Sequence, residues 1–487
     1  MLTQRLLQRL FVLVLFWSGA SFASNIVVDR SWVEDPSGTM TIDQVRAAAA
    51  QPLTGPYFGR GFSTSTFWIR LRIDPSRLPA GSASDRLVVR IRPVYLHEIQ
   101  LYDLLDDGDK PRMTGGHYSW RQDEYQSLNL NFVVPRGEAE RDIWLRLRSF
   151  SSTFSSFEVL PESEARAIDL RQMLLAGLYQ VLLFICLGWS ALAWFMFRES
   201  LIKFYLVREV VVIVYAMVIW GVWRSWGSTW APVWWIERVS HFIMFLLGFT
   251  MVSFDAYFLR QFKPAPWLLK TLYGVSASFG FQLLVSMAGY WQEAFIINSY
   301  VLLLAIVLVF MTVLSTRAWS EPNPGQRPDF SKWLLVCMYV FLFLIVLFGR
   351  LAALGILSSG YDAFYLGMLY PLAGSVLMMA LLQIRAMRRH KRQQEVQLRL
   401  HVVEQLAQDE RIRREDQAHF LAMLGHELRN PLAAVGFLAD SQTDEGKLIR
   451  RAVDDMTQVL ERSMHVSKLG DARMAFEFTE LNLHELT

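Results

Sequence analysis

The feature that most constrains this chain is a series of apolar stretches between residues 173 and 384. Most of them reach or approach the roughly 20 residues that an α-helix needs to cross the hydrocarbon core of a bilayer. Because 53% of all residues are hydrophobic and 17 are tryptophan, the composition also favours a membrane protein over a soluble enzyme. The pattern predicts a seven-helix transmembrane domain over residues 171–385, with spans at 173–197, 204–223, 242–258, 272–290, 295–316, 333–354 and 364–384.

The distribution of basic residues predicts the orientation of this domain. The loops after the fourth and sixth stretches carry no Lys or Arg, whereas the residues after the seventh are rich in them: Arg385, Arg388, Arg389, Lys391 and Arg392. Loops on the cytoplasmic side of a membrane carry an excess of Lys and Arg. We therefore expect the C-terminal part in the cytoplasm and the residues before 171 on the outer side.

The first residues have the layout of a secretory signal peptide. Arg5 and Arg9 precede a short apolar run at 10–17, and Ser21 and Ala23 supply the small residues of a cleavage site. This predicts that residues 1–23 are removed and that the next domain is exported. An uncleaved anchor helix is the alternative.

Residues 24–170 alternate apolar and polar side chains with a period of two. In "FWIRLRI", Phe67, Ile69 and Leu71 fall on one face while Arg70 and Arg72 fall on the other, and "LVVRIRP" and "DIWLRLR" repeat the pattern. Turn-forming segments such as "DDGDKP" separate these short runs. The region is therefore predicted to be an extracytoplasmic β-sandwich with a hydrophobic core.

Composition argues against several other kinds of site. Cys186 and Cys337, the two cysteines, both lie in apolar runs and indicate neither a disulfide framework nor a zinc site, so no metal site is expected. The net charge is only +3, so nothing in the overall charge favours a nucleic-acid partner.

The membrane domain contains four ionisable residues and one tryptophan-rich segment that could have structural or functional roles. His241 and Arg350 fall near the outer ends of their stretches, where signal transmission is a secondary hypothesis. Arg208 and Asp255 are expected to be solvated at the inner boundary. The tryptophans within 220–235 are typical of an interfacial aromatic belt, and a stacking surface for a ligand is the alternative.

The residues after the seventh stretch predict two amphipathic helices. Residues 386–415 carry an apolar seam typical of a coiled-coil linker, and residues 416–472 are predicted to form an antiparallel helical hairpin around the loop "ADSQTDEGK". Two such hairpins would form the four-helix bundle of a homodimer. The seam residues are Val396, Leu400, Val403 and Ala407 in the linker and Ile449, Ala452, Met456, Val459, Ser463 and Val466 in the second helix.

The segment "FLAMLGHELRNPLAAV" places a histidine on the outer face of the first hairpin helix. Leu421, Leu424 and Leu428 are expected to point into the bundle. His426 is two residues from Leu424 and from Leu428, about 200° around the helix from each, so it is expected to face outward rather than to be a core histidine. A neutral, exposed imidazole can act as a nucleophile.

The neighbours of His426 suit this chemistry. Glu427 can accept a hydrogen bond from one ring nitrogen and leave the other free to attack phosphorus. Asn430 lies one turn further on the same face and could orient a water molecule. Pro431 lacks a backbone donor and is expected to kink the helix just beyond the site.

"HELRNP", with its flanking residues, closely resembles the phosphoacceptor box of bacterial sensor histidine kinases. The resemblance implies that His426 is phosphorylated, that Glu427 is its acid-base partner, and that Asn430 assists dephosphorylation of a response regulator. It also implies ATP and Mg as the phosphoryl donor, a homodimer, a receiver-domain partner and a location in the bacterial inner membrane.

The outer and membrane regions resemble a subfamily of these receptors. "STFWIRLRI", "IRPVYLHEIQLYD" and "DIWLRLRS", followed by seven helices, look like the diverse-intracellular-signalling-module seven-transmembrane receptors. Their outer domain is a jelly roll similar to carbohydrate-binding modules. Whether this domain binds a sugar, a peptide or nothing stays open.

The last residues leave two functional hypotheses. Residues 473–487 look like the start of an ATP-binding domain, and the cytoplasmic part has no glycine-rich phosphate loop, which favours a truncated chain. The leading hypothesis is a transmembrane sensor histidine kinase that autophosphorylates on His426. The alternative is a phosphotransfer receptor phosphorylated in trans. A transporter is disfavoured because four of the seven stretches carry no charged residue.

Overall fold

The computed structural model describes residues 26–78, 84–105, 111–320, 328, 330–353, 362–438 and 443–471. The expected signal peptide at 1–23 and the expected start of an ATP-binding domain at 473–487 lie outside these residues. The chain divides into two compact units, Met1–Ala386 and Met387–Thr487, which are described in turn.

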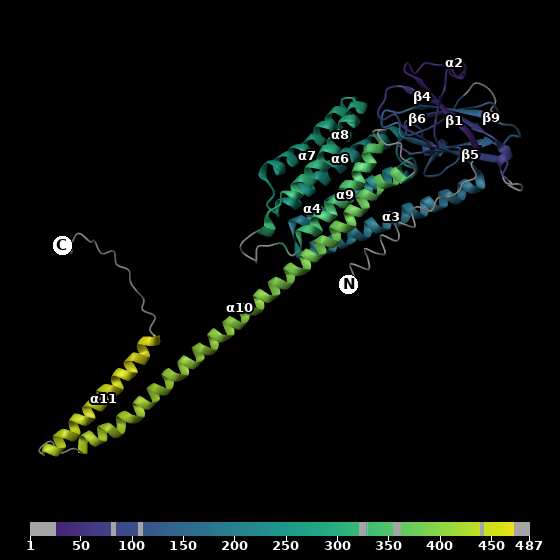
Figure 1. Cartoon of the computed structure of the whole chain (residues 1–487). Coiled ribbons are helices and arrows are strands. Elements are labelled where there is room, and N and C mark those ends of the chain that lie inside the picture. The colour runs from purple at the N-terminus through teal and green to yellow at the C-terminus, as the bar shows by residue number, and fades with distance from the viewer. Residues whose placement is uncertain are drawn as a thin grey trace, which may run out of the picture. The chain divides into compact units, whose positions relative to one another are not determined.

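The first unit begins with two antiparallel sheets (Figure 1). The two sheets share one hydrophobic core. The six-stranded sheet has the order β2 (Gln51–Pro52), β1 (Val27–Asp35), β4 (Thr66–Ile73), β9 (Arg141–Arg148), β6 (Glu98–Asp103) and β7 (Arg112–Thr114). The four-stranded sheet has the order β3 (Tyr57–Phe58), β10 (Ser155–Pro161), β5 (Arg86–Arg92) and β8 (Leu130–Pro135), and the short helix α2 (Ile42–Ala47) follows β1.

The alternating pattern of the sequence produces this core. Ile69 of β4 pairs with Leu145 of β9 and with Trp32 of β1, and all three side chains are buried. Val89 of β5 and Phe132 of β8, from the other sheet, belong to the same core. Inward-facing residues of two sheets thus interdigitate, which confirms the predicted β-sandwich.

The outer face of β5 is covered, which the alternation did not predict. Arg90 and Arg92 point away from the shared core, yet only 1% and 4% of their surfaces are exposed. Glu158 of β10 accepts a hydrogen bond from each guanidinium, at 3.1 Å and 2.6 Å, and Asp169 accepts from Arg90 at 2.6 Å. Asp169 lies on α3 (Glu162–Phe197), which begins directly after β10. The contact with Arg90 shows that the first turns of α3 pack against the sandwich, before the first apolar stretch begins.

Each of the seven predicted stretches corresponds to a helix. Six described helices are long and apolar enough to cross a membrane: α3, α6 (Val233–Arg260), α7 (Pro266–Met287), α8 (Trp291–Leu314), α9 (Lys332–Ala353) and α10 (Asp362–Leu438). The seventh, α4 (Ser200–Ile219), carries Lys203, Arg208 and Glu209 and is not among the six. A short helix, α5 (Val222–Gly227), follows it.

Aromatic side chains fill the space between the helices of the bundle. Phe254 and Phe258 of α6 belong to a core cluster with Phe279 of α7 and Tyr339 of α9. Gly248 of α6 lies so close to Phe279 that a methyl group there would overlap the ring. The absence of a side chain at this glycine therefore sets how closely α6 and α7 approach.

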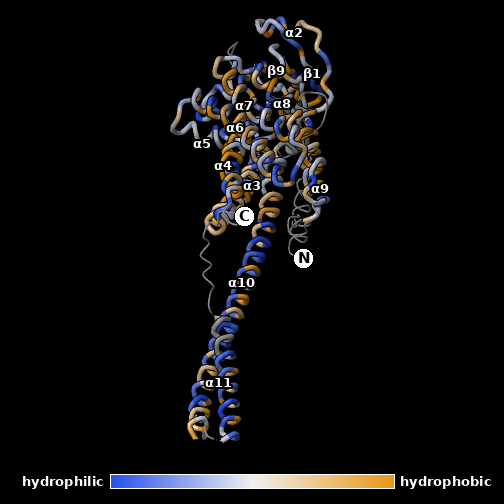
Figure 2. The backbone as a smooth tube through the Cα atoms, turned by 90° about the vertical axis from the view of Figure 1, so that its left-hand side faces the viewer, coloured by the Kyte–Doolittle hydropathy of each residue, from blue (hydrophilic) through white to orange (hydrophobic). Residues whose placement is uncertain are grey.

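The second unit is an antiparallel helical hairpin formed by the later part of α10 and by α11 (Asp444–Asp471). Arg429 forms an ion pair with Glu461 at 3.4 Å, and a side chain at Gly436 would contact Val453. Along α10 the hydrophobic colouring gives way to a largely hydrophilic helix (Figure 2). These contacts confirm the hairpin.

The predicted seams of this unit are exposed in the single chain. Val403 is 61% exposed, Leu421 41% and Leu428 46%. Such apolar exposure is what a surface buried in a dimer would show. The coiled coil and the four-helix bundle stay predictions.

Candidate functional site

The predicted phosphoacceptor box lies on α10 in the second unit. The side chains of His426, Glu427 and Asn430 are exposed, whereas Leu424 is half-buried. His426 and Asn430 are one turn apart and therefore share a helix face. His426 is thus exposed in the single chain, and its role as a phosphoacceptor stays a prediction.

The side chain of His426 is not held by its neighbour Glu427. Among the described residues, His426 and Glu427 form no hydrogen bond with each other. α10 continues through Pro431 to Leu438, so the proline does not end the helix. Its missing N–H leaves the carbonyl of Glu427 without the usual partner four residues on. The expected kink stays a prediction.

A second cluster of polar side chains, which the sequence did not predict, joins the sandwich to α6. His97 comes from the segment between β5 and β6, His117 from the segment after β7, and Glu237 and His241 from α6. His117 Nδ1 lies 3.0 Å from Glu237 Oε2, and His97 Nε2 lies 3.8 Å from Glu237 Oε1. The rings of His97 and His241 have centroids 6.0 Å apart. We call these four residues the junction cluster.

Burial and neighbouring groups set the protonation of the two histidines that the sandwich contributes. Burial, followed by the nearby His241, lowers the pKa of His97 to about 3, so this ring is neutral at pH 7. The hydrogen bond with Glu237 raises the pKa of His117. His97 Nδ1 lies 3.2 Å from Ser149 Oγ and 3.3 Å from the N–H of Phe150, so both tautomers of the ring have a partner there.

Three residues of the junction cluster, His97, Glu237 and His241, line a cavity of about 300 Å³. The cavity continues among α6, α8 and α9, where Met244, Phe295 and Leu302 make its wall apolar. Asp255 and Tyr339 also line it and are joined by a hydrogen bond of 2.8 Å. An apolar cavity with a few polar groups is typical of a small-ligand site.

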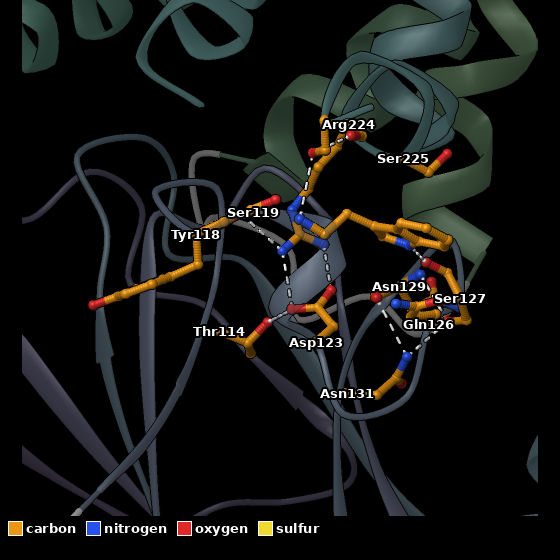
Figure 3. Close-up of polar contacts among 12 residues, drawn as sticks. Thr114, Tyr118, Ser119, Asp123, Gln126, Ser127, Asn129, Asn131, Arg224 and Ser225 are labelled. Atoms are coloured by element: carbon orange, nitrogen blue, oxygen red, sulfur yellow. Dashed lines mark hydrogen bonds and ion pairs between the residues drawn. The ribbon is translucent and has the colours of Figure 1, made fainter. Parts of the chain in front are cut away.

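A buried ion pair forms another contact between the sandwich and the helices (Figure 3). Arg224 of α5 donates from Nη1 to Asp123 Oδ2 at 2.6 Å and from Nη2 to Asp123 Oδ1 at 3.1 Å. Nη2 also donates to the carbonyl of Tyr118 at 3.1 Å, and Thr114 Oγ1 donates to Asp123 at 2.8 Å. This two-pronged geometry fixes both distance and orientation.

The expectation that Arg208 is solvated is wrong. Arg208 is 4% exposed and lies 3.6 Å from the Glu209 carboxylate, which accepts a hydrogen bond from Ser375 at 2.8 Å. Its guanidinium lies over the Phe254 ring of α6, 5.3 Å from the centroid. Asp255 is half-buried and lines the cavity. Partners on other helices, invisible in the local sequence, keep these groups inside the bundle.

The tryptophan-rich segment packs largely on itself. Trp223 packs against three other tryptophans, with ring centroids 5.8 to 6.1 Å away, and Trp230 packs against Trp226 and Trp235 at 5.1 and 5.3 Å. Trp226, Trp230 and Trp234 are nevertheless more than half exposed. An aromatic belt and a stacking surface both stay open as interpretations.

The sequence left open the roles of His241 and Arg350, near the outer ends of their apolar stretches. The structure describes the side chain of His241. It belongs to the junction cluster, and Trp291 and Phe295 pack against it with centroids 4.8 and 5.0 Å away. The signal available in the sequence was an ionisable residue inside an apolar stretch. The side chain of Arg350 lies outside the described residues.

The fold and the sites together define a membrane receptor with an extracellular-type β domain and a helical membrane domain. Residues 29–160 match the family described as 7TMR-DISM extracellular 2, and residues 171–388 match the family described as 7TM diverse intracellular signalling. The two matches support the 7TMR-DISM receptor family, whose domains occur in membrane sensor proteins, often with histidine kinases. No curated protein matches the chain. The matched ranges end at residue 388 and so do not test the phosphoacceptor box.

Proposed function

We propose that this receptor is a transmembrane sensor histidine kinase of a bacterial two-component system. The observation that carries the proposal is the exposed group of His426, Glu427 and Asn430 on α10, the same helix that begins as the last predicted membrane span. A change in the membrane domain would therefore reach His426 through a continuous helix.

In the proposed reaction, a neutral ring nitrogen of His426 attacks the γ-phosphorus of ATP. The N–P bond forms as the P–O bond to ADP breaks, and Glu427 stabilises or accepts the proton of the other ring nitrogen. An aspartate of the response regulator then attacks the phosphorus and breaks the N–P bond. Asn430 orients the water that later hydrolyses the aspartyl phosphate. ATP with Mg would be bound by an ATPase domain, and the reaction would proceed in a homodimer.

The test is phosphoryl labelling of the chain with such an ATPase domain supplied. His426→Ala is expected to abolish an acid-labile, base-stable label, and Glu427→Gln to slow labelling by about 10²–10⁴-fold. Asn430→Ala should label normally but dephosphorylate the regulator slowly. His419→Ala is the matched control, because this exposed histidine on the same helix lacks an adjacent acid. Wild-type labelling of His426→Ala would refute the assignment.

We also propose that the sandwich lies outside the inner membrane and the hairpin in the cytoplasm, because basic residues concentrate after the last span. A reporter fused after Asp169 should be active only outside, and one fused after Arg392 only inside. The same sidedness for both fusions would mean an even number of spans.

A further inference from the structure

We propose that His97, Glu237 and His241 form a binding site for a divalent transition-metal ion, best suited to Zn²⁺, between the sandwich and α6. One ligand atom from each residue lies within 4.8 Å of the other two. Two imidazoles and one carboxylate are a ligand set that Zn²⁺ uses in proteins, with the fourth position open to water or a ligand. This inference does not depend on phosphotransfer at His426.

The spacing of the three ligand atoms leaves room for a metal ion between them. Ligands about 2.0–2.2 Å from a tetrahedral Zn²⁺ lie roughly 3.3 Å from one another. The 3.8 Å between His97 Nε2 and Glu237 Oε1 is too long for a hydrogen bond, so these two atoms do not bind each other and both are available to an ion.

The positions of the ligands in the chain also favour coordination. Glu237 and His241 are four residues apart on α6, so they project from the same helix face. His241 Nδ1 is buried and has no hydrogen-bond partner among the described residues. Leaving such a nitrogen unpartnered costs free energy, which a bound ion would offset.

Two neighbouring side chains can hold the ligands in place. Ser149 Oγ, 3.2 Å from His97 Nδ1, can accept a hydrogen bond from the Nδ1–H group, which leaves Nε2 unprotonated with its lone pair free to bind the ion. Metal binding would select this tautomer. His117, 3.0 Å from the other oxygen of Glu237, orients the carboxylate and is a positioning residue. Such outer partners are typical of metal sites.

The site would couple the two parts of the receptor. His97 belongs to the sandwich, whereas Glu237 and His241 belong to a helix long and apolar enough to cross the membrane. An ion bound by all three is bound only while the sandwich and α6 are in contact, so binding stabilises that arrangement. His97, Glu237 and His241 all line the cavity, from which a small molecule could complete the coordination.

The test uses the full chain in lipid nanodiscs, treated with chelator and titrated with Zn²⁺ or Co²⁺. We expect one ion per chain and, with Co²⁺, the visible absorption of a tetrahedral site. His241→Gln and Glu237→Gln should lose this ion. His117→Gln should keep the stoichiometry with an affinity about 10–100-fold weaker, and His419→Ala should behave as wild type.

Two results of the metal titration would overturn the proposed metal site. No bound ion in the wild-type chain, or one ion of wild-type affinity in both Glu237→Gln and His241→Gln, would overturn it. If one of these variants does not fold, as judged by its elution and thermal unfolding, the other decides. Phosphoryl labelling is a separate readout, so a failure of metal binding is distinguishable from a failure of the kinase proposal.

Discussion

Replacing Arg224 with methionine would leave the carboxylate of Asp123 buried without its cation. Arg224 and Asp123 are 8% and 7% exposed and share two hydrogen bonds, at 2.6 Å and 3.1 Å. Methionine keeps much of the length of the arginine stem. After the change Asp123 retains the hydrogen bond from Thr114 Oγ1. The perturbation therefore tests the ion pair with little change in packing.

The expected cost is large because one charge stays buried. Removing one partner of a buried ion pair typically costs about 3–5 kcal/mol, which shifts an equilibrium by more than about 100-fold. A double variant, Asp123→Leu with Arg224→Met, should recover most of this loss, because no uncompensated charge remains.

Hydrogen exchange in the short helix Trp120–Gln122 reports the opening of this contact. The N–H of Trp120 donates to Ser228 Oγ at 3.4 Å, across the same contact as the ion pair. When reclosing is fast, the exchange rate rises in proportion to the opening equilibrium. We expect Arg224→Met to accelerate exchange of the Trp120 amide by about 100-fold or more.

Arg121→Met is the matched control. Arg121 is exposed and donates a single hydrogen bond of 3.0 Å to the carbonyl of Thr229 across the same contact. Its loss should cost about 0.5–1.5 kcal/mol, or at most about tenfold in exchange. Equal exchange in Arg121→Met and Arg224→Met, or a double variant as labile as Arg224→Met, would refute the reasoning.

Three further predictions follow from other contacts. Gly248→Ala should lower the thermal stability of the membrane domain, because the methyl group overlaps a ring of α7, while Gly280→Ala, with open space around it, should not. Cysteines at Val403 and Leu424 should crosslink the proposed dimer in membranes, and an absence of dimers at both positions would argue against the seam. The pKa of Asp35 lies below its ordinary value, because hydrogen bonds from a serine hydroxyl and two backbone amides outweigh its burial. The ionised Asp35 therefore contributes fully to the free energy of unfolding above about pH 3.8, and this contribution is lost as the pH falls through the folded-state pKa. Asp35→Asn should consequently destabilise the sandwich at pH 7 and progressively less in acid, as measured by thermal unfolding.

Several parts of the fold were predictable because their signal is local. The alternation around Ile69 repeats every two residues, and the side-chain period of a strand converts it directly into one buried and one outer face. The apolar stretches specify helices in the same way, because their length alone matches the bilayer. The exposed position of His426 likewise follows from its angle relative to Leu424 on a single helix.

The long-range contacts required the tertiary structure. The alternation alone does not show that α3 covers the outer face of β5 at Arg90, and Arg208, expected in solvent, lies against α6.

By itself, then, the sequence determined the β-sandwich, the helical membrane domain and the outward-facing histidine, because short-range periodicity is sufficient for each. Only the tertiary structure brought His97 to Glu237 and His241, and Asp123 to Arg224. These partners are more than 100 positions apart in the sequence. No spacing rule connects such residues, because their proximity depends on how the sandwich packs against α5 and α6.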